Sequence, residues 1–181
     1  YAYQWLRCSP AVSSNKTSLP IGCSLIDGAE AKTYTATLAD VGKYLTARVT
    51  ASNAVGDTVI WAKSGDQVYQ APNYLNDPTL DDVRIVGDEV TASTGVTEGL
   101  PTAVSTNQWY RCSSMLTVAQ VTVPATCTLI VGAPATGGYT LQAADVSKYI
   151  AAFVTITNAA GSAKKLTAST RQVISNPVIT P

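Results

Sequence analysis

An internal repeat is the sequence feature that most restricts how this chain of 181 residues can fold. Residues 3–8 return as residues 107–112 at an offset of 104. Residues 34–57 return as residues 139–162 at an offset of 105, and 13 of these 24 positions are identical. Shared composition does not produce so many identities in one register, so we predict two duplicated domains.

The two copies differ in what precedes the repeated core. Residues 77–106 lie before the second copy's tryptophan and contain two strand-like pieces, 83–86 and 89–93, separated by the turn pair Gly87-Asp88. Residues 1–70 contain no counterpart of this stretch. We therefore expect the first domain to lack its N-terminal strands, which an earlier part of a longer array or another chain would supply.

The last residues resemble the opening of a further copy. Ser175-Asn176-Pro177 is similar to Asn76-Asp77-Pro78, where the second copy begins. We expect residues 178–180 to be extended and to reach beyond the second domain. The predicted division is residues 1–75, residues 76–175 and, as the start of another repeat, residues 176–181.

Alternation of side chains predicts strands in both copies. Residues 45–52 alternate between apolar and polar side chains, and residues 150–157 repeat the pattern with Phe153 on the outward side. A period of two is typical of a half-buried strand, and residues 53–57 are rich in turn formers. Short strands joined by such turns predict an all-β fold of antiparallel sandwiches.

The amino-acid composition argues against several classes of function. Twelve Lys and Arg residues balance twelve Asp and Glu residues, which argues against a nucleic-acid partner. There is no histidine, so the commonest general base and the commonest metal ligand are missing. No apolar run approaches the roughly 20 residues of a membrane helix. We expect a domain pair without cofactor, catalytic activity or membrane span.

Particular motifs resemble the immunoglobulin-like family. Asp40-Val41-Gly42-Lys43-Tyr44, with Asn53 and Gly56 after the next strand, resembles the E–F corner and F strand of that fold. The string Gln-Trp-x-Arg-Cys with a later Ala-Asp-Val-x-Lys-Tyr is similar to tandem Ig-like repeats of secreted or surface proteins from actinobacteria.

The resemblance implies two tandem Ig-like sandwiches and a set of structural core residues. Trp5 and Trp109 match the buried tryptophan of strand C. The other core residues that it implies are Asp40, Tyr44, Asp145 and Tyr149. The position of the usual inter-sheet cysteine, two residues after the corner tyrosine, holds Thr46 or Ala151 instead, so burial must hold the layers together.

The four cysteines fall as one pair per copy, with fourteen residues between the members of each pair. Four cysteines allow three connectivities, but a self-sufficient repeat favours Cys8–Cys23 and Cys112–Cys127. A closed loop of this size stabilises a domain by roughly 3 kcal/mol. Disulfides persist outside the reducing cytosol, so we expect an extracellular or cell-surface location. The alternative of a metal or redox pair has little support without histidine.

The two cysteine-bounded loops, 9–22 and 113–126, differ completely in sequence, which is where a repeated scaffold could bind a ligand. The second loop is apolar, and we predict an exposed interface there. Its members are Met115, Leu116, Val118, Val121 and, on the neighbouring strand, Phe153. Sequence drift in surface loops is the preferred explanation of the difference between the two loops.

Two clusters of charged residues have a functional and a structural interpretation. Asp77, Asp81, Asp82 and Asp88 could hold calcium at the junction, although solvated acids that protect strand edges are commoner. Asp40 beside Lys43 recurs in the second copy as Asp145 beside Lys148 and could form an isopeptide crosslink, but residues that shape a turn explain the recurrence more simply.

Taken together, these features predict a structural segment of a stalk, fibre or adhesin, whose partners are neighbouring repeats or identical chains. The alternatives are a module that binds surface carbohydrate or protein through the cysteine-bounded loops, and an appendage or decoration domain of a virus.

Overall fold

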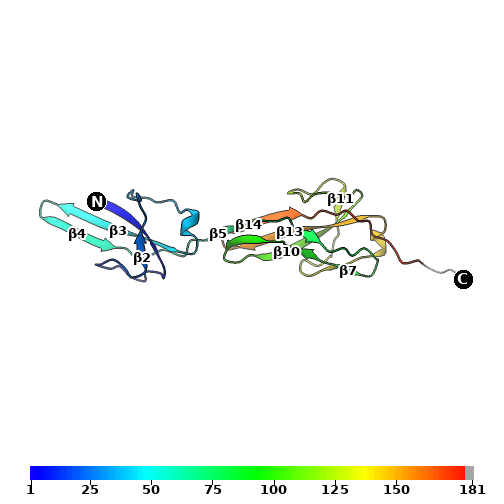
Figure 1. Cartoon of the computed structure of the whole chain (residues 1–181), viewed down its shortest axis with the longest axis horizontal. Coiled ribbons are helices and arrows are strands. Elements are labelled where there is room, and N and C mark those ends of the chain that lie inside the picture. The colour runs from blue at the N-terminus through cyan, green and yellow to red at the C-terminus, as the bar shows by residue number, and fades with distance from the viewer. Residues whose placement is uncertain (178–181) are drawn as a thin grey trace. The chain divides into compact units, whose positions relative to one another are not determined.

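The computed structural model describes residues 1–177, so the expected extension of residues 178–180 lies outside the described residues. It divides into two compact units, Tyr1–Gln70 and Ala71–Pro181 (Figure 1). The division falls five residues before the expected boundary at residue 75. Among the described residues the regular structure consists of β-strands and two short 3-10 helices, and no helix is long and apolar enough to cross a membrane.

Unit 1 is one antiparallel sheet with the strand order β2-β1-β3-β4. Its members are β1 (Ala2–Cys8), β2 (Cys23–Leu25), β3 (Tyr44–Asn53) and β4 (Gly56–Trp61), and the helix η1 (Leu38–Asp40) leads into β3. Trp5 lies opposite Ala47, and Cys8 lies opposite both Cys23 and Tyr44. The alternating stretch 45–52 is therefore a central strand, as its period of two predicts.

Unit 2 contains a second four-stranded antiparallel sheet with the corresponding order β11-β10-β13-β14. Its members are β10 (Val104–Cys112), β11 (Cys127–Leu129), β13 (Tyr149–Asn158) and β14 (Gly161–Leu166), with η2 (Ala143–Asp145) before β13. Trp109 lies opposite Ala152, and Cys112 lies opposite Cys127 and Tyr149. The two large sheets share both strand order and register.

Unit 2 also has a second layer, made of paired short strands. β12 (Tyr139–Thr140) pairs with β7 (Glu89–Val90), β6 (Thr79–Leu80) with β8 (Ala92–Ser93), and β5 (Gln70–Tyr74) with β9 (Thr97–Leu100). The core between the layers contains Val90, Trp109, Tyr139, Leu141, Ile150, Ala152, Val154 and Val173. This arrangement is consistent with a β-sandwich.

Unit 1 has no counterpart of the strands β6 to β9. The tryptophan face of its sheet is therefore less covered: Trp5 is half-buried, whereas Trp109 is 1% exposed. The prediction that both tryptophans are buried core residues is thus wrong for Trp5. A side chain on a sheet becomes fully buried only when another layer or a loop packs over it, and unit 1 provides no such cover for Trp5.

Two other expectations need correction. Residues 83–86 do not form a strand; only Ile85 makes an isolated bridge, to Ile174, and the predicted turn at Gly87-Asp88 follows it. In addition, Val173 exchanges backbone hydrogen bonds with Ser147 and Lys148 as Val68 does with Gly42 and Lys43. This register matches Pro177 with Pro72, not with Pro78.

Candidate functional site

The fully buried carboxylate of Asp145, at the end of η2, accepts hydrogen bonds from Arg111, Tyr139 and Gln142. Arg111 donates to it from Nε at 2.6 Å and from Nη2 at 2.5 Å. The hydroxyl of Tyr139 donates at 2.9 Å and the backbone N–H of Gln142 at 2.7 Å. With this many donors, a buried charge is fully compensated.

Unit 1 repeats this arrangement around Asp40, which is also fully buried. Arg7 donates from Nε at 2.7 Å and from Nη2 at 2.6 Å, the Tyr34 hydroxyl at 2.9 Å and the Thr37 N–H at 2.7 Å. We call each set of Asp, Arg and Tyr the corner triad. Because Asp40 is ion-paired with Arg7, its carboxylate is engaged in the triad and not in a crosslink to Lys43.

Burial and hydrogen bonding act in opposite directions on these groups. Burial alone would raise the pKa of the Asp40 carboxyl, but hydrogen bonds from the Thr37 N–H, Arg7, Tyr34 and the Thr37 hydroxyl outweigh it and lower the pKa. For Tyr139, burial and the adjacent Asp145 carboxylate both raise the pKa, to about 12. The lowered pKa of Asp40 favours its ionised form and the raised pKa of Tyr139 favours its protonated form, which are the forms that the hydrogen bonds of the two triads require.

Sequence reasoning found Asp40 and Asp145 but missed Arg7, Tyr34, Arg111 and Tyr139. The signal was present, because all four positions are identical between the copies. The predicted corner tyrosines, Tyr44 and Tyr149, lie instead half-buried against the apolar clusters on the opposite sheet face.

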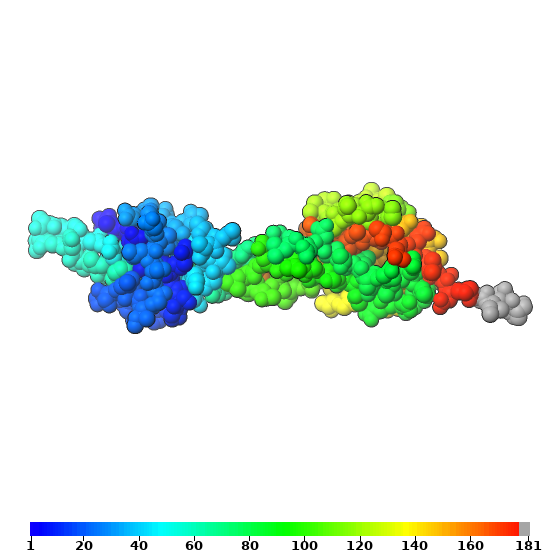
Figure 2. Space-filling model, in the orientation of Figure 1, coloured from blue at the N-terminus to red at the C-terminus, as the bar shows by residue number. Residues whose placement is uncertain are grey.

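The structure contains both predicted disulfides, Cys8–Cys23 and Cys112–Cys127, and no free cysteine among the described residues. Each bond joins the ends of neighbouring strands and closes the loop between them. In unit 2 this loop folds over the outer face of the sheet and forms the raised yellow-green region of Figure 2. A second apolar cluster results, made of Cys112, Leu116, Cys127, Ala151, Phe153 and Leu166.

The folded loop buries part of the predicted interface. Leu116 is 4% exposed and Phe153 is 7% exposed, so the prediction that they form an exposed patch is wrong. Backbone hydrogen bonds fix the loop in place: Leu116 exchanges two with Ser169, and Gln120 exchanges two with Leu166. Only Met115, Val118 and Val121 of the predicted set remain exposed, at 49%, 62% and 67%.

Unit 1 builds the same outer cluster from different side chains. Leu6, Cys8 and Trp61 of the sheet are buried there together with Val12 of the loop 9–22. Arg48 lies opposite Trp61 on the neighbouring strand, with its guanidinium 5.8 Å from the ring centroid. The corresponding pair in unit 2 is Phe153 opposite Leu166. The cross-strand pair thus contains one aromatic ring in each unit, contributed by opposite members of the pair.

The acidic residues near the start of unit 2 do not converge. Asp77 pairs with Lys165, Asp82 pairs with Arg171 at 2.6 Å, and Asp81 accepts hydrogen bonds from the backbone and hydroxyl of Thr91. Within residues 1–177 no three side chains of the metal-ligating types come together. The carboxylates are distributed among separate partners, so the structure gives no support to the calcium interpretation.

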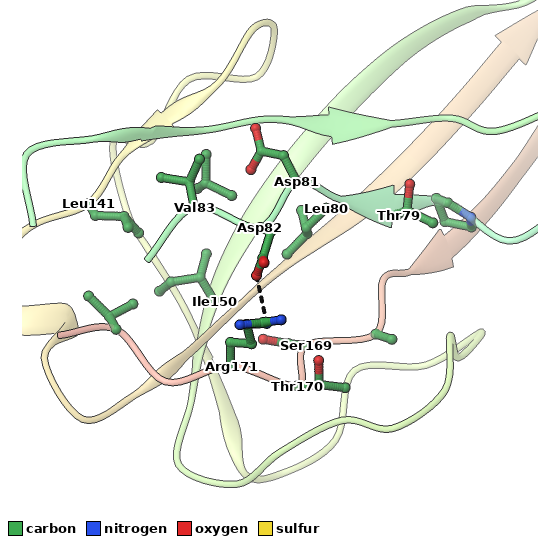
Figure 3. Close-up of a pocket in the computed structure, with 14 residues that line it drawn as sticks. Thr79, Leu80, Asp81, Asp82, Val83, Leu141, Ile150, Ser169, Thr170 and Arg171 are labelled. Carbon is green, nitrogen blue, oxygen red and sulfur yellow. Dashed lines mark ion pairs between the residues drawn. The ribbon is translucent and has the colours of Figure 1, made fainter. Parts of the chain in front are cut away.

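A cavity of about 230 Å³ opens in unit 2 between residues 78–83 and residues 168–173 (Figure 3). Leu141, Ile150 and Val83 line its apolar side, and the ion pair of Asp82 with Arg171 crosses between the two segments. Asp82 and Arg171 neutralise each other, and the remaining acidic residue of the lining, Asp81, accepts hydrogen bonds from Thr91.

Comparisons with known proteins add no identification: no protein-family model matches the chain, and neither a curated protein nor a solved structure matches it.

Proposed function

We propose that the chain is a structural segment of tandem Ig-like repeats in an extracellular or cell-surface stalk, fibre or adhesin. The observation that carries this proposal is duplication: a disulfide and a corner triad occupy the same positions of the sheet in both units. Interactions that hold a unit together are repeated, whereas the exposed loop surfaces differ. A repeat protein whose units each carry their own stabilising bonds is suited to a mechanical role.

Strand order supports the Ig-like part of the proposal. The order β11-β10-β13-β14 corresponds to C′-C-F-G of a variable-type immunoglobulin sheet, and the pair β7 with β12 corresponds to B with E of the opposite sheet. In this assignment Trp109 is on strand C and the triad carboxylate of Asp145 precedes strand F. The proposed extracellular location rests on the two disulfides, because disulfides persist in oxidising compartments.

Single-molecule pulling of the full chain from its two ends tests the mechanical role. We expect a distinct force peak for unit 2, with an extension shortened by the residues that Cys112–Cys127 encloses. A reducing agent should lengthen that extension by about 50 Å, since the bond spans 15 residues of roughly 3.4 Å each. Unfolding of unit 2 without a measurable force peak would contradict the proposal.

A second candidate function, recognition of a surface carbohydrate or protein, rests on the exposed side chains of Met115, Val118 and Val121. Three apolar side chains on one disulfide-bounded loop offer a contact surface that loses little conformational entropy when it binds a ligand. Glycan-array screening of the chain beside the variant Val121→Asp tests this function. Binding that the variant abolishes would favour recognition, and equal binding by both proteins would exclude this loop.

A further inference from the structure

In unit 2 the segment that contains β7 forms part of the cover over the tryptophan face of the sheet. Val90 of β7 lies opposite Tyr139 and packs into the core that contains Trp109. The turn before β7 is bonded to the same element, because Gly87 N–H donates to Leu141 O and Leu141 N–H donates to Asp88 O, both at 2.9 Å. The cover is thus held by apolar contact and by a row of backbone hydrogen bonds.

In unit 1 the equivalent apolar face is present without this cover. Trp5, Tyr34, Leu45 and Val49 are only half-buried. Their counterparts Trp109, Tyr139, Ile150 and Val154 are 1%, 5%, 4% and 0% exposed. The face differs at one covered position, where the exposed Ala36 corresponds to the buried Leu141. The underlying apolar surface is otherwise similar in kind in the two units.

The backbone next to this face also lacks a partner strand. Tyr139–Thr140 is a strand because β7 pairs with it, whereas the same dipeptide at residues 34–35 has no strand assignment. Within the described part of the chain, no backbone hydrogen bond joins residues 34–36 to another segment. An unpaired edge beside an uncovered apolar face is the condition under which an added strand binds.

We propose that the tryptophan face of unit 1 binds an extended segment of the same kind as residues 83–93, supplied by a polypeptide other than residues 1–70 and other than a second copy of this chain. The segment runs antiparallel to residues 34–36 and places an aliphatic side chain, the counterpart of Val90, against Trp5 and Tyr34. This inference concerns a binding surface and does not depend on the mechanical function proposed above.

The structure also specifies how the bound segment differs from residues 83–93. Glu89 lies over Gly138, where an added Cβ would come within 2.4 Å of the Glu89 carboxylate oxygen. The residue of unit 1 that corresponds to Gly138 is Thr33, which carries a Cβ. A segment that binds unit 1 in this register therefore needs either another rotamer at the position of Glu89 or a smaller residue there, and the probe below uses the smaller residue.

Hydrogen exchange measured by NMR on the full chain tests the proposal, with a synthetic peptide of residues 77–106 carrying Glu89→Ser as the probe. The amide of Ala36 should exchange fast in the free chain, and at a peptide concentration ten times Kd it should slow by about tenfold. The amide of Leu141 is the internal control and should not change. The matched control peptide carries Val90→Asp as well and should give no protection.

A covalent version removes any dependence on peptide affinity. Residues 71–104 with Glu89→Ser, joined directly to Tyr1, reproduce the connection that leads into β10 in unit 2, and Ala36 should then be protected as Leu141 is. Failure of both the peptide and the fused segment to protect Ala36 would overturn the proposal. So would protection of Ala36 in the unmodified chain that rises with dimer formation in sedimentation, because the occupant would then be a second copy.

Discussion

Arg111 donates two hydrogen bonds to one oxygen of Asp145, from Nε at 2.6 Å and from Nη2 at 2.5 Å, and the carboxylate that receives them is inaccessible to solvent. Arg7 and Asp40 form the same contact in unit 1. Since strand β10 supplies the arginine and the 3-10 helix before β13 supplies the carboxylate, this ion pair fixes the entry into the central strand of the sheet.

Removal of this carboxylate should destabilise unit 2 severely. We expect Asp145→Ala to lower the free energy of unfolding by about 3–5 kcal/mol, because it leaves a largely buried arginine without its partner. The measurement is hydrogen exchange of the slowest amides of unit 2. Asp82→Ala is the matched control: its ion pair with Arg171 is about half exposed, so the loss should stay under about 1 kcal/mol. Equal losses in the two variants would contradict the role given to the triad.

The tyrosine of the same triad makes unit 2 sensitive to alkali. Because the pKa of Tyr139 is raised to about 12 from the ordinary value near 10, the folded state holds the phenolic proton more tightly than the unfolded state. The associated stability, about 3 kcal/mol at most, is fully present below pH 10 and is lost as the pH rises through 12. Burial also raises the pKa of Tyr74 to about 12, so the contribution of Tyr139 is the difference between the native chain and Tyr139→Phe in pH-dependent denaturation. Parallel curves for the two proteins above pH 10 would refute it.

The outer cluster of unit 2 gives a third prediction. Phe153→Ala should cost about 3–5 kcal/mol, because the ring is buried between the sheet and the loop 113–126. Met115→Ala, on the exposed side of the same loop, should change stability by less than about 0.5 kcal/mol. Chemical denaturation of both variants provides the comparison, and a negligible effect of Phe153→Ala would mean that the loop does not cover the sheet in solution.

The two tryptophans should respond differently to the same substitution. Trp109→Ala removes a fully buried ring and should cost about 3–5 kcal/mol. Trp5→Ala removes a half-buried ring and should cost less than half as much in the unmodified chain. Amide exchange in each unit reports the two losses separately. Similar losses would show that unit 1 already has a cover over its tryptophan.

Each disulfide should stabilise its own unit. Peptide mapping without reduction should yield the Cys8–Cys23 and Cys112–Cys127 links, and a peptide that joins the two units would contradict the fold. Reduction should lower the free energy of unfolding of each unit by about 3 kcal/mol, from the added entropy of the unfolded chain. Thermal denaturation with and without reductant, compared with the double variant Cys112→Ala/Cys127→Ala, measures the contribution of unit 2.

Sequence alone predicted the two central strands and the disulfides, because both depend on local pattern or on the repeat, whereas the strand expected at residues 83–86 does not form. The alternation from Leu45 and from Ile150 correctly assigned the two faces of the central strands. It could not tell that the outward face would be covered, since the segment above Phe153 is a loop without periodicity. The prediction that Trp5 is buried was wrong for a related reason. A strand pattern shows which side of the sheet an aromatic residue faces, but not whether another layer lies over it.

The triads were partly missed because their members are far apart in the chain. Arg7 and Asp40 are separated by 33 residues, and no local spacing rule joins them. Identity between the two copies was the available signal, and it marked both partners. Their pairing required knowledge of the register that brings β1 beside β3.

The cross-strand pair has its aromatic ring at Trp61 in unit 1 but on the other strand, at Phe153, in unit 2. This difference has a consequence for engineering and for evolution. Arg48 with Trp61, and Phe153 with Leu166, are alternative fillings of one space beneath a disulfide-bounded loop. A loop grafted alone from one unit onto the other would meet the ring on the wrong strand, so the loop and its cross-strand pair form the smallest part that can be transplanted intact. Diversification of these loops is therefore coupled to the sheet below them, and surface variation in such a protein has to proceed by compensated, multi-residue steps.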